Sequence, residues 1–239
     1  MKKAFEKFLN IEPNVISEYL AKFLDFHLKR TSKSTVGLND EQLESKVKET
    51  IFLLKLVKAK DIFEEFYMRG LSRRLLLKKS ASNEAEKIMV SRLRTECSNE
   101  FSTKTEAMLK DLSQSDVFMS EYKSMKGGEM EMLRKNQGVD ASFHVLSSGS
   151  WPISAQIKDL KMPDLLHTVQ KEFEMYYKVK HQGRCLTFAP SMSTSLVFAN
   201  FVPKPNGNFT KQHQLEVSGL QAIVLVAFNT KEELTYLEL

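Results

Sequence analysis

The chain has 239 residues, of which 42% are hydrophobic and 27% are charged, a composition typical of a globular protein and not of a disordered chain. Its 35 Lys and Arg residues against 30 Asp and Glu residues leave a formal net charge of +5, which is a weak signal for a dedicated nucleic-acid binder. Two cysteines exclude a disulfide scaffold and a four-cysteine metal site, and no apolar run reaches the roughly 18 residues of a transmembrane helix.

Residues 1–126 are predicted to form a helical bundle of the four-helix type, because one proline and two glycines leave long uninterrupted segments. Asn39 with Gln42 has the pattern of a capping box, and Ser82 is expected to be a helix N-cap. A short helix is expected to restart at Asp116 and to end near Lys126. Leu54, Met89, Leu93 and Phe101 are expected inside the bundle. Apolar side chains recur at helical spacing in two stripes, Leu43, Val47, Ile51, Leu54 and Val57, and Ala85, Ile88, Met89, Leu93, Cys97 and Phe101.

The pattern changes after Lys126-Gly127-Gly128, and residues 127–217 are predicted to form a small α/β domain with a mixed or antiparallel sheet, giving an α+β fold. A helix is expected from Pro163 to about Val179. A cluster rich in Pro, Asn and Gly at 203–208 predicts a turn, and Leu220 to Phe228 is nearly all apolar and predicts a buried helix. The expected strands are Phe143–Leu146, Cys185–Phe188, Leu196–Val202 and Leu215–Val217.

No motif of a known chemistry stands out. The five histidines have no metal-ligand spacing, and Ser147-Ser148-Gly149-Ser150 is not a nucleophile-elbow motif. Buried structural thiols are the expectation for Cys97 and Cys185, although a hydrolase that uses Ser150 or Cys185 stays open as an alternative. We therefore predict no catalytic residue, no metal site and no cofactor.

Two features favour interaction with other molecules. A basic run with no acid, which contains Arg69, lies between Phe66 and Asn83, and its residues Arg73, Arg74, Lys78 and Lys79 are candidates for docking an acidic partner. A solvated helix face is the plainer interpretation, and pairing of Arg73 and Arg74 with Glu64 or Glu65 inside the bundle is a third. The single tryptophan, Trp151, is either a core anchor or part of an interface.

Several motifs in order resemble the cullin homology region. Each is weak alone, but together they extend over residues 4–239. The motifs are Lys60–Tyr67, Leu71–Leu76, Lys79–Ser82 with Glu86-Lys87, Leu93–Cys97 with Phe101–Lys104, Val145–Pro152, Phe173–Tyr177, Lys180–Leu186 and Ala227–Asn229.

The resemblance implies a non-catalytic scaffold of a cullin-RING E3 ubiquitin ligase, acting in ubiquitin-dependent protein degradation. Its partners would be a RING-box protein, a ubiquitin-conjugating enzyme held indirectly, and exchange or inhibitory factors of cullins. The RING-box protein would add a strand to the sheet of the α/β domain. The candidate residues for the apolar side of this joint are Phe143, Val145, Trp151, Leu186, Phe188 and Phe198.

The resemblance also sets expectations at the two ends of the chain. Family members carry an N-terminal stalk of helical repeats and a C-terminal winged-helix region, so residues 218–239 are interpreted as the start of a truncated winged-helix-like region. The chain start lacks the apolar core of a signal peptide, which predicts an intracellular protein, cytoplasmic and nuclear, with no membrane partner.

The alternative function is a basic nucleic-acid-binding or general interaction module, with nucleic acid the less favoured partner.

Overall fold

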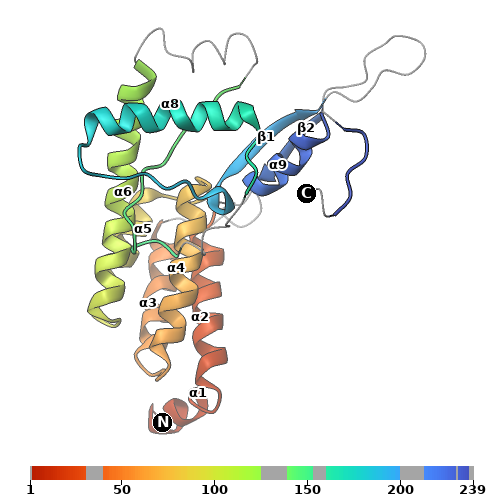
Figure 1. Ribbon diagram of the computed structural model, residues 1–239. Coiled ribbons are helices and arrows are strands. Elements are labelled where there is room, and N and C mark those ends of the chain that lie inside the picture. The colour runs from red at the N-terminus through yellow and green to blue at the C-terminus, as the bar shows by residue number, and fades with distance from the viewer. Residues whose placement is uncertain are drawn as a thin grey trace. The chain divides into compact units, whose positions relative to one another are not determined.

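The computed structural model describes residues 2–30, 40–124, 139–152, 160–199, 213–229 and 231–236 (Figure 1). The chain divides into two compact units, Met1–Glu121 with Phe143–Pro152, and Tyr122–Ser142 with Ile153–Leu239. The first is helical and the second contains helices and a small antiparallel sheet, which confirms the predicted α+β fold. The expected boundary at 126–128, the turn at 203–208 and the capping residue Asn39 lie outside the described residues.

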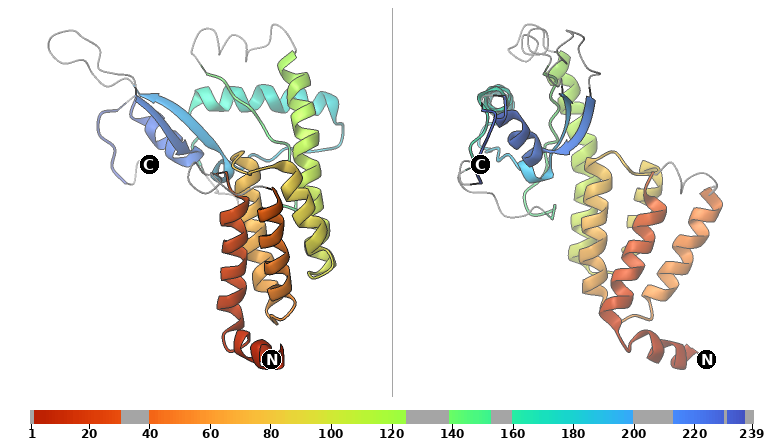
Figure 2. Two further views of the ribbon diagram at one scale, coloured as in Figure 1. Left: turned by 180° about the vertical axis from the view of Figure 1, so that it is seen from behind. Right: turned by 90° about the vertical axis from the view of Figure 1, so that its right-hand side faces the viewer.

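The helical unit is built on α2, which packs against α4 and α3, while α3 packs against α5 (Figure 2). Pro13 opens α2 at a position where its missing N–H costs nothing. Ser82 caps α5 as predicted, since its side chain accepts hydrogen bonds from the N–H groups of Glu84 and Ala85. The helices of this unit are α1 (Lys2–Leu9), α2 (Pro13–Leu28), α3 (Asp40–Leu54), α4 (Lys60–Leu76), α5 (Asn83–Leu93) and α6 (Asn99–Ser124).

The predicted core of this unit is confirmed, because Leu54, Met89, Leu93 and Phe101 are each at most 2% exposed. One member of the second stripe was assigned wrongly, since Ile88 lies at the edge of the buried face and is 52% exposed. The restart at Asp116 was also wrong, because α6 is continuous across this position. Asp116 is compatible with a helix interior, and no Gly or Pro interrupts residues 99–124.

Leu93→Ala is expected to lower the free energy of unfolding of the helical unit by about 2–5 kcal/mol, because the truncation leaves a cavity in a core that is fully closed at this position. Thermal unfolding followed by circular dichroism measures the loss. Ile88→Ala is the matched control on the same helix, and its effect should stay within about 1 kcal/mol because the side chain is half-exposed. Equal effects of the two substitutions would contradict the assignment of the core face.

The second unit contains one antiparallel pair of strands in its described part. Thr194 pairs with Ser218 at one end of the register and Ala199 with His213 at the other. Pro163 stands directly before α8, so the helix expected from this proline is confirmed with its start one residue later. The elements are α8 (Asp164–Lys180), the 3-10 turn η1 (Pro190–Met192), β1 (Thr194–Ala199), β2 (His213–Ser218) and α9 (Gly219–Ala227).

Two of the four expected strands are wrong, because neither Phe143–Leu146 nor Cys185–Phe188 belongs to a strand. Both segments have no regular secondary structure, and their backbone does not join the ladder of β1 and β2. The first lies in the helical unit, where the N–H of Val145 donates to Ser115 Oγ at 2.7 Å. The alternation of apolar residues therefore did not identify a strand, because all four side chains of 143–146 are half-buried.

The apolar segment near the C-terminus forms α9, as predicted, but it is less buried than expected. Only Gly219 and Ala222 are buried, while Val224, Leu225 and Phe228 are between 37% and 45% exposed. A two-stranded sheet covers one side of a helix and leaves the other side open. None of the helices in the described part of the chain is both long and apolar enough to cross a lipid bilayer.

Candidate functional site

The β1–β2 sheet has one covered face and one open face. Along β1 the exposed side chains of Thr194, Leu196 and Phe198 alternate with half-buried ones, as expected for a strand packed on one side. The covered face lies toward α9, the helix that contacts both strands. On the open face Leu196 is 55% exposed and Phe198 is 49% exposed, so an apolar strip about one strand wide remains uncovered.

In the described part of the chain no third strand joins either edge of this sheet. Within the described residues β1 hydrogen-bonds along one side to β2 and has no strand on its other side, and the same holds for β2. Unpaired N–H and C=O groups on such an edge can accept a strand from another chain. The edge of β1 lies next to the exposed side chains of Leu196 and Phe198, so a strand added there would also meet an apolar surface.

The start of α9 is fixed tightly against η1, which holds the sheet in place. Ser218 caps the helix in a capping box with Gln221, and the N–H of Gly219 donates to the backbone oxygen of Ser193 at 2.9 Å. A Cβ on Gly219 would lie 1.8 Å from Ser193 Oγ and 2.7 Å from the Pro190 carbonyl oxygen. Only glycine fits this close approach.

The segment Phe143–Pro152 is fastened to α6 by side-chain hydrogen bonds. Asp111 accepts one bond each from the N–H and the hydroxyl of Ser147, both at 2.7 Å, and one from Trp151 Nε1 at 2.8 Å. Trp151 is 5% exposed and belongs to the core cluster of the helical unit. Of the two interpretations of this tryptophan, the core anchor is the one that the structure supports.

The six candidates for the RING-box joint do not gather on one sheet. Phe143, Val145 and Trp151 belong to the helical unit, so the expectation that they form part of the sheet domain is wrong. Leu186 and Phe188 lie in the second unit, half-buried in the segment that precedes η1. Of the six, Phe198 alone is a residue of the sheet, and sequence reasoning missed its neighbour Leu196 although the two share a face by the two-residue period of a strand.

Arg74 is not available for docking, which corrects its place among the candidates. Its side chain is 1% exposed, and its guanidinium donates to both carboxylate oxygens of Glu86, at 2.7 and 3.0 Å, and to Asp25. Glu86 is itself fully buried and also accepts a bond from Ser80 Oγ at 2.7 Å. Burial alone would lower the pKa of Arg74, but the bonds and charge of Glu86 outweigh it and raise the pKa above its ordinary value.

Gly70 permits this arrangement, because a Cβ at its position would lie 2.9 Å from Asp25 Oδ1. Among the other basic candidates, Arg73 and Lys78 are exposed and Lys79 is half-buried. The suggested pairing with Glu64 or Glu65 is wrong for Arg74, since Glu65 pairs with Arg69 and Glu64 accepts bonds from Ser98. The accessible basic surface is therefore smaller than the sequence indicates.

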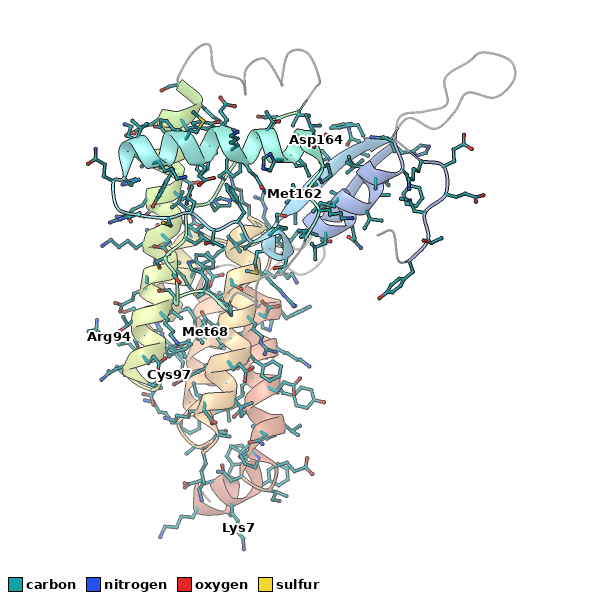
Figure 3. The ribbon with its side chains drawn as sticks, in the orientation of Figure 1. Lys7, Met68, Arg94, Cys97, Met162 and Asp164 are labelled. Atoms are coloured by element: carbon teal, nitrogen blue, oxygen red, sulfur yellow. The ribbon has the colours of Figure 1, made fainter. Side chains whose placement is uncertain are left out.

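The two cysteines differ in their surroundings. Cys97 lies in the connection between α5 and α6 (Figure 3), and burial, with a smaller contribution from Glu64, raises the pKa of its thiol to about 12. At neutral pH it is a protonated and poorly nucleophilic thiol. Cys185 is exposed. In the part of the chain that the structure describes, no three His, Cys, Asp or Glu side chains form a group able to hold a metal ion.

Acid is expected to destabilise the helical unit through His144. Burial lowers its pKa in the folded state, with Asp116 acting against the shift and Lys78 with it. Because the unfolded chain then binds the proton more readily, stability is lost as the pH falls through and below the ordinary value of about 6.5. Denaturant unfolding between pH 5 and 8 should show a shallower pH dependence for His144→Gln than for the unchanged protein.

A residual pH dependence should remain in that variant, because burial also lowers the pKa of His27. The control is His167→Gln, which changes an exposed histidine on α8 of the other unit. An identical slope for His144→Gln and the unchanged protein would show that His144 does not contribute.

Family models and curated relatives match this chain over both of its units. A family model described as the Cullin alpha solenoid domain matches residues 1–119, and one described as the Cullin alpha+beta domain matches residues 145–239. Cullin-3 of Dictyostelium discoideum is 33% identical over all of this chain and 29% of its own length, and Cullin-4 of the same organism is 34% identical over 96% of this chain and 27% of its own. Cullin-4A of Homo sapiens is 31% identical over all of this chain and 30% of its own length. The chain thus spans less than a third of each of these relatives.

Proposed function

Because this chain belongs to the cullin family, we propose that it is a scaffold of a cullin-RING ubiquitin ligase and acts in ubiquitin-dependent protein degradation by binding a RING-box subunit. The observation that carries this proposal is the open β1–β2 sheet, which lies in the region matched by the alpha+beta family model. A strand of the partner would pair with the outer edge of β1 and contact Leu196 and Phe198. Main-chain bonds would supply affinity and the apolar strip would supply specificity.

The test is copurification of this chain with a RING-box protein. We expect the two to form a complex, and deletion of the N-terminal strand of the partner should abolish it while leaving the RING folded. Phe198→Glu and Leu196→Glu should weaken binding by about tenfold or more, because each places a charge in an apolar joint. Equal binding of the strandless and intact partners would contradict the strand-addition site.

A matched control separates binding from folding. Val117→Glu introduces the same charge at a side chain of α6 that is 62% exposed, outside the sheet, and should leave the complex unchanged. Circular dichroism should give the same helical content for all three variants. A loss of binding in Val117→Glu would indicate a general effect of added negative charge.

The scaffold contributes no catalytic group in this proposal. The protonated state of Cys97 supports this, because a thioester carrier needs a reactive thiolate. The variant with Cys97→Ala and Cys185→Ser should therefore bind the RING-box protein as the unchanged chain does. A ubiquitin thioester trapped on either cysteine would contradict the proposal.

The exposed basic residues Arg73 and Lys78, with the half-buried Lys79, are proposed to attract acidic segments of a ubiquitin-conjugating enzyme. Charge reversal of Arg73 and Lys78 should slow association and flatten its salt dependence, because long-range attraction between opposite charges speeds encounter. The fold should be unaffected, since neither side chain is buried. An association rate that does not change would remove this docking site from the proposal.

A further inference from the structure

The outer side of α2 carries an apolar stripe that no described element of the helical unit covers. Val15, Tyr19, Phe23 and Phe26 follow each other at spacings of 4, 4 and 3 residues, which places them on one side of the helix. They are 41%, 64%, 40% and 59% exposed. We call these four residues the α2 stripe.

The opposite side of α2 already faces the core of its own unit. Its buried residues there are Ser17, Leu20, Ala21, Leu24 and Leu28. The right-hand panel of Figure 2 shows α2 beside α4, the helix that it contacts most. A helix that is apolar on two sides is typical of one buried on both, so the outer side indicates a missing contact.

Further apolar side chains are exposed on the residues that precede α2. Phe5 and Phe8 of α1 are 44% and 64% exposed, and Ile11 in the turn before α2 is 71% exposed. With a large aromatic side chain burying about 150–250 Å² when fully covered, the exposed parts of the four stripe residues offer on the order of 350 Å² per copy. This is about half of the roughly 800 Å² per partner of a standard interface, which is the size expected of a weak dimer.

The charged residues beside the α2 stripe indicate what kind of partner binds it. Glu18 and Lys22 flank the stripe on one side, with Lys22 Nζ 2.5 Å from Glu18 Oε1. If a second copy of α2 lies antiparallel across a two-fold axis near residues 20 and 21, Val15 faces Phe26 and Tyr19 faces Phe23. In the same arrangement Glu18 of each copy faces Lys22 of the other. The stripe is thus complementary to itself in both apolar contacts and charge.

We propose that two copies of this chain associate through the α2 stripe, with the two α2 helices antiparallel. Each copy supplies the same surface, so both stripes are used in the contact and no further copy can be added. The sheet of the second unit plays no part in this contact.

The experiment measures the mass of the purified chain by sedimentation equilibrium over a range of micromolar concentrations. A dimer is expected. Lys22→Glu makes positions 18 and 22 both acidic and Glu18→Lys makes both basic, so each variant alone should dimerise about tenfold or more weakly because like charges then face each other at these two positions.

An equimolar mixture of the two variants should form a heterodimer, since the acidic flank of one copy then faces the basic flank of the other. Loss of the Glu18–Lys22 pair within one copy cannot produce this recovery, because the pair is absent in both variants. A charged residue within the apolar stripe, as in Tyr19→Glu, should give a monomer with unchanged circular dichroism.

The matched control is the pair Glu174–Lys178 on α8, which has the same spacing and nearly the same exposure, 35% and 59% against 35% and 60%. Lys178→Glu and Glu174→Lys should each leave the dimer unchanged. A monomer at all concentrations, or a mixture that fails to form heterodimers, would overturn the proposal. So would binding of the monomer to anionic lipid vesicles through the same stripe.

Discussion

Replacing Arg74 by methionine is expected to lower the free energy of unfolding of the helical unit by about 3–5 kcal/mol. The substitution keeps most of the apolar volume but leaves the Glu86 carboxylate, which is fully buried, without its cation. Asp25 suffers less, because its side chain is 32% exposed and can be hydrated. Denaturant unfolding at neutral pH, followed by circular dichroism, measures the loss.

Two further variants separate the buried charge from the loss of an ordinary ion pair. Arg69→Met removes an exposed pair with Glu65 on the same helix and should cost at most about 1 kcal/mol. Arg74→Met combined with Glu86→Leu removes both members of the buried pair, and should recover much of the stability because no buried carboxylate is left unpaired. If Arg74→Met and Arg69→Met had equal effects, the buried network would not contribute to folding.

The burial of Arg74 could have been predicted from spacing, although its place in a basic run suggested an exposed residue. Phe63, Tyr67, Leu71 and Arg74 recur at intervals of 4, 4 and 3, so the arginine lies on the core face of α4. Glu86 stands three residues before Met89 on the core face of α5. Two opposite charges on facing apolar stripes are the signal of a buried pair.

Sequence signals that depend on only a few neighbouring residues predicted the helix starts well. Ser82 caps α5 through N–H groups two and three residues away, and the Pro163 start of α8 depends on one residue. The sheet was predicted less well, because the alternation of Phe143 and Val145 does not say what the segment contacts. Its partner is α6, roughly 30 residues earlier in the chain, and the bond from Val145 N–H to Ser115 has no local signature.

Replacing Trp151 by alanine is expected to cost about 3–5 kcal/mol in the helical unit, because it empties a buried site and removes one of the three hydrogen bonds to Asp111. Trp151→Phe should cost less, since the ring still fills part of the site and Ser147 keeps its two bonds to the carboxylate. Phe52→Ala is the control, because Phe52 is an aromatic residue that is 56% exposed on α3, and its effect should stay near zero.

The same variants separate a structural role of Trp151 from a role in binding a partner. If the tryptophan fastens Phe143–Pro152 to α6, amide hydrogen exchange at Val145 and Ser147 should speed up in Trp151→Ala, because their N–H groups donate to α6 side chains that the segment would no longer hold. Trp151→Phe should then bind a RING-box protein as tightly as the unchanged chain. A normal unfolding curve and unchanged hydrogen exchange, together with weakened RING-box binding, would instead indicate that Trp151 contacts the partner, because neither the fold nor the attachment of the segment would then explain the loss.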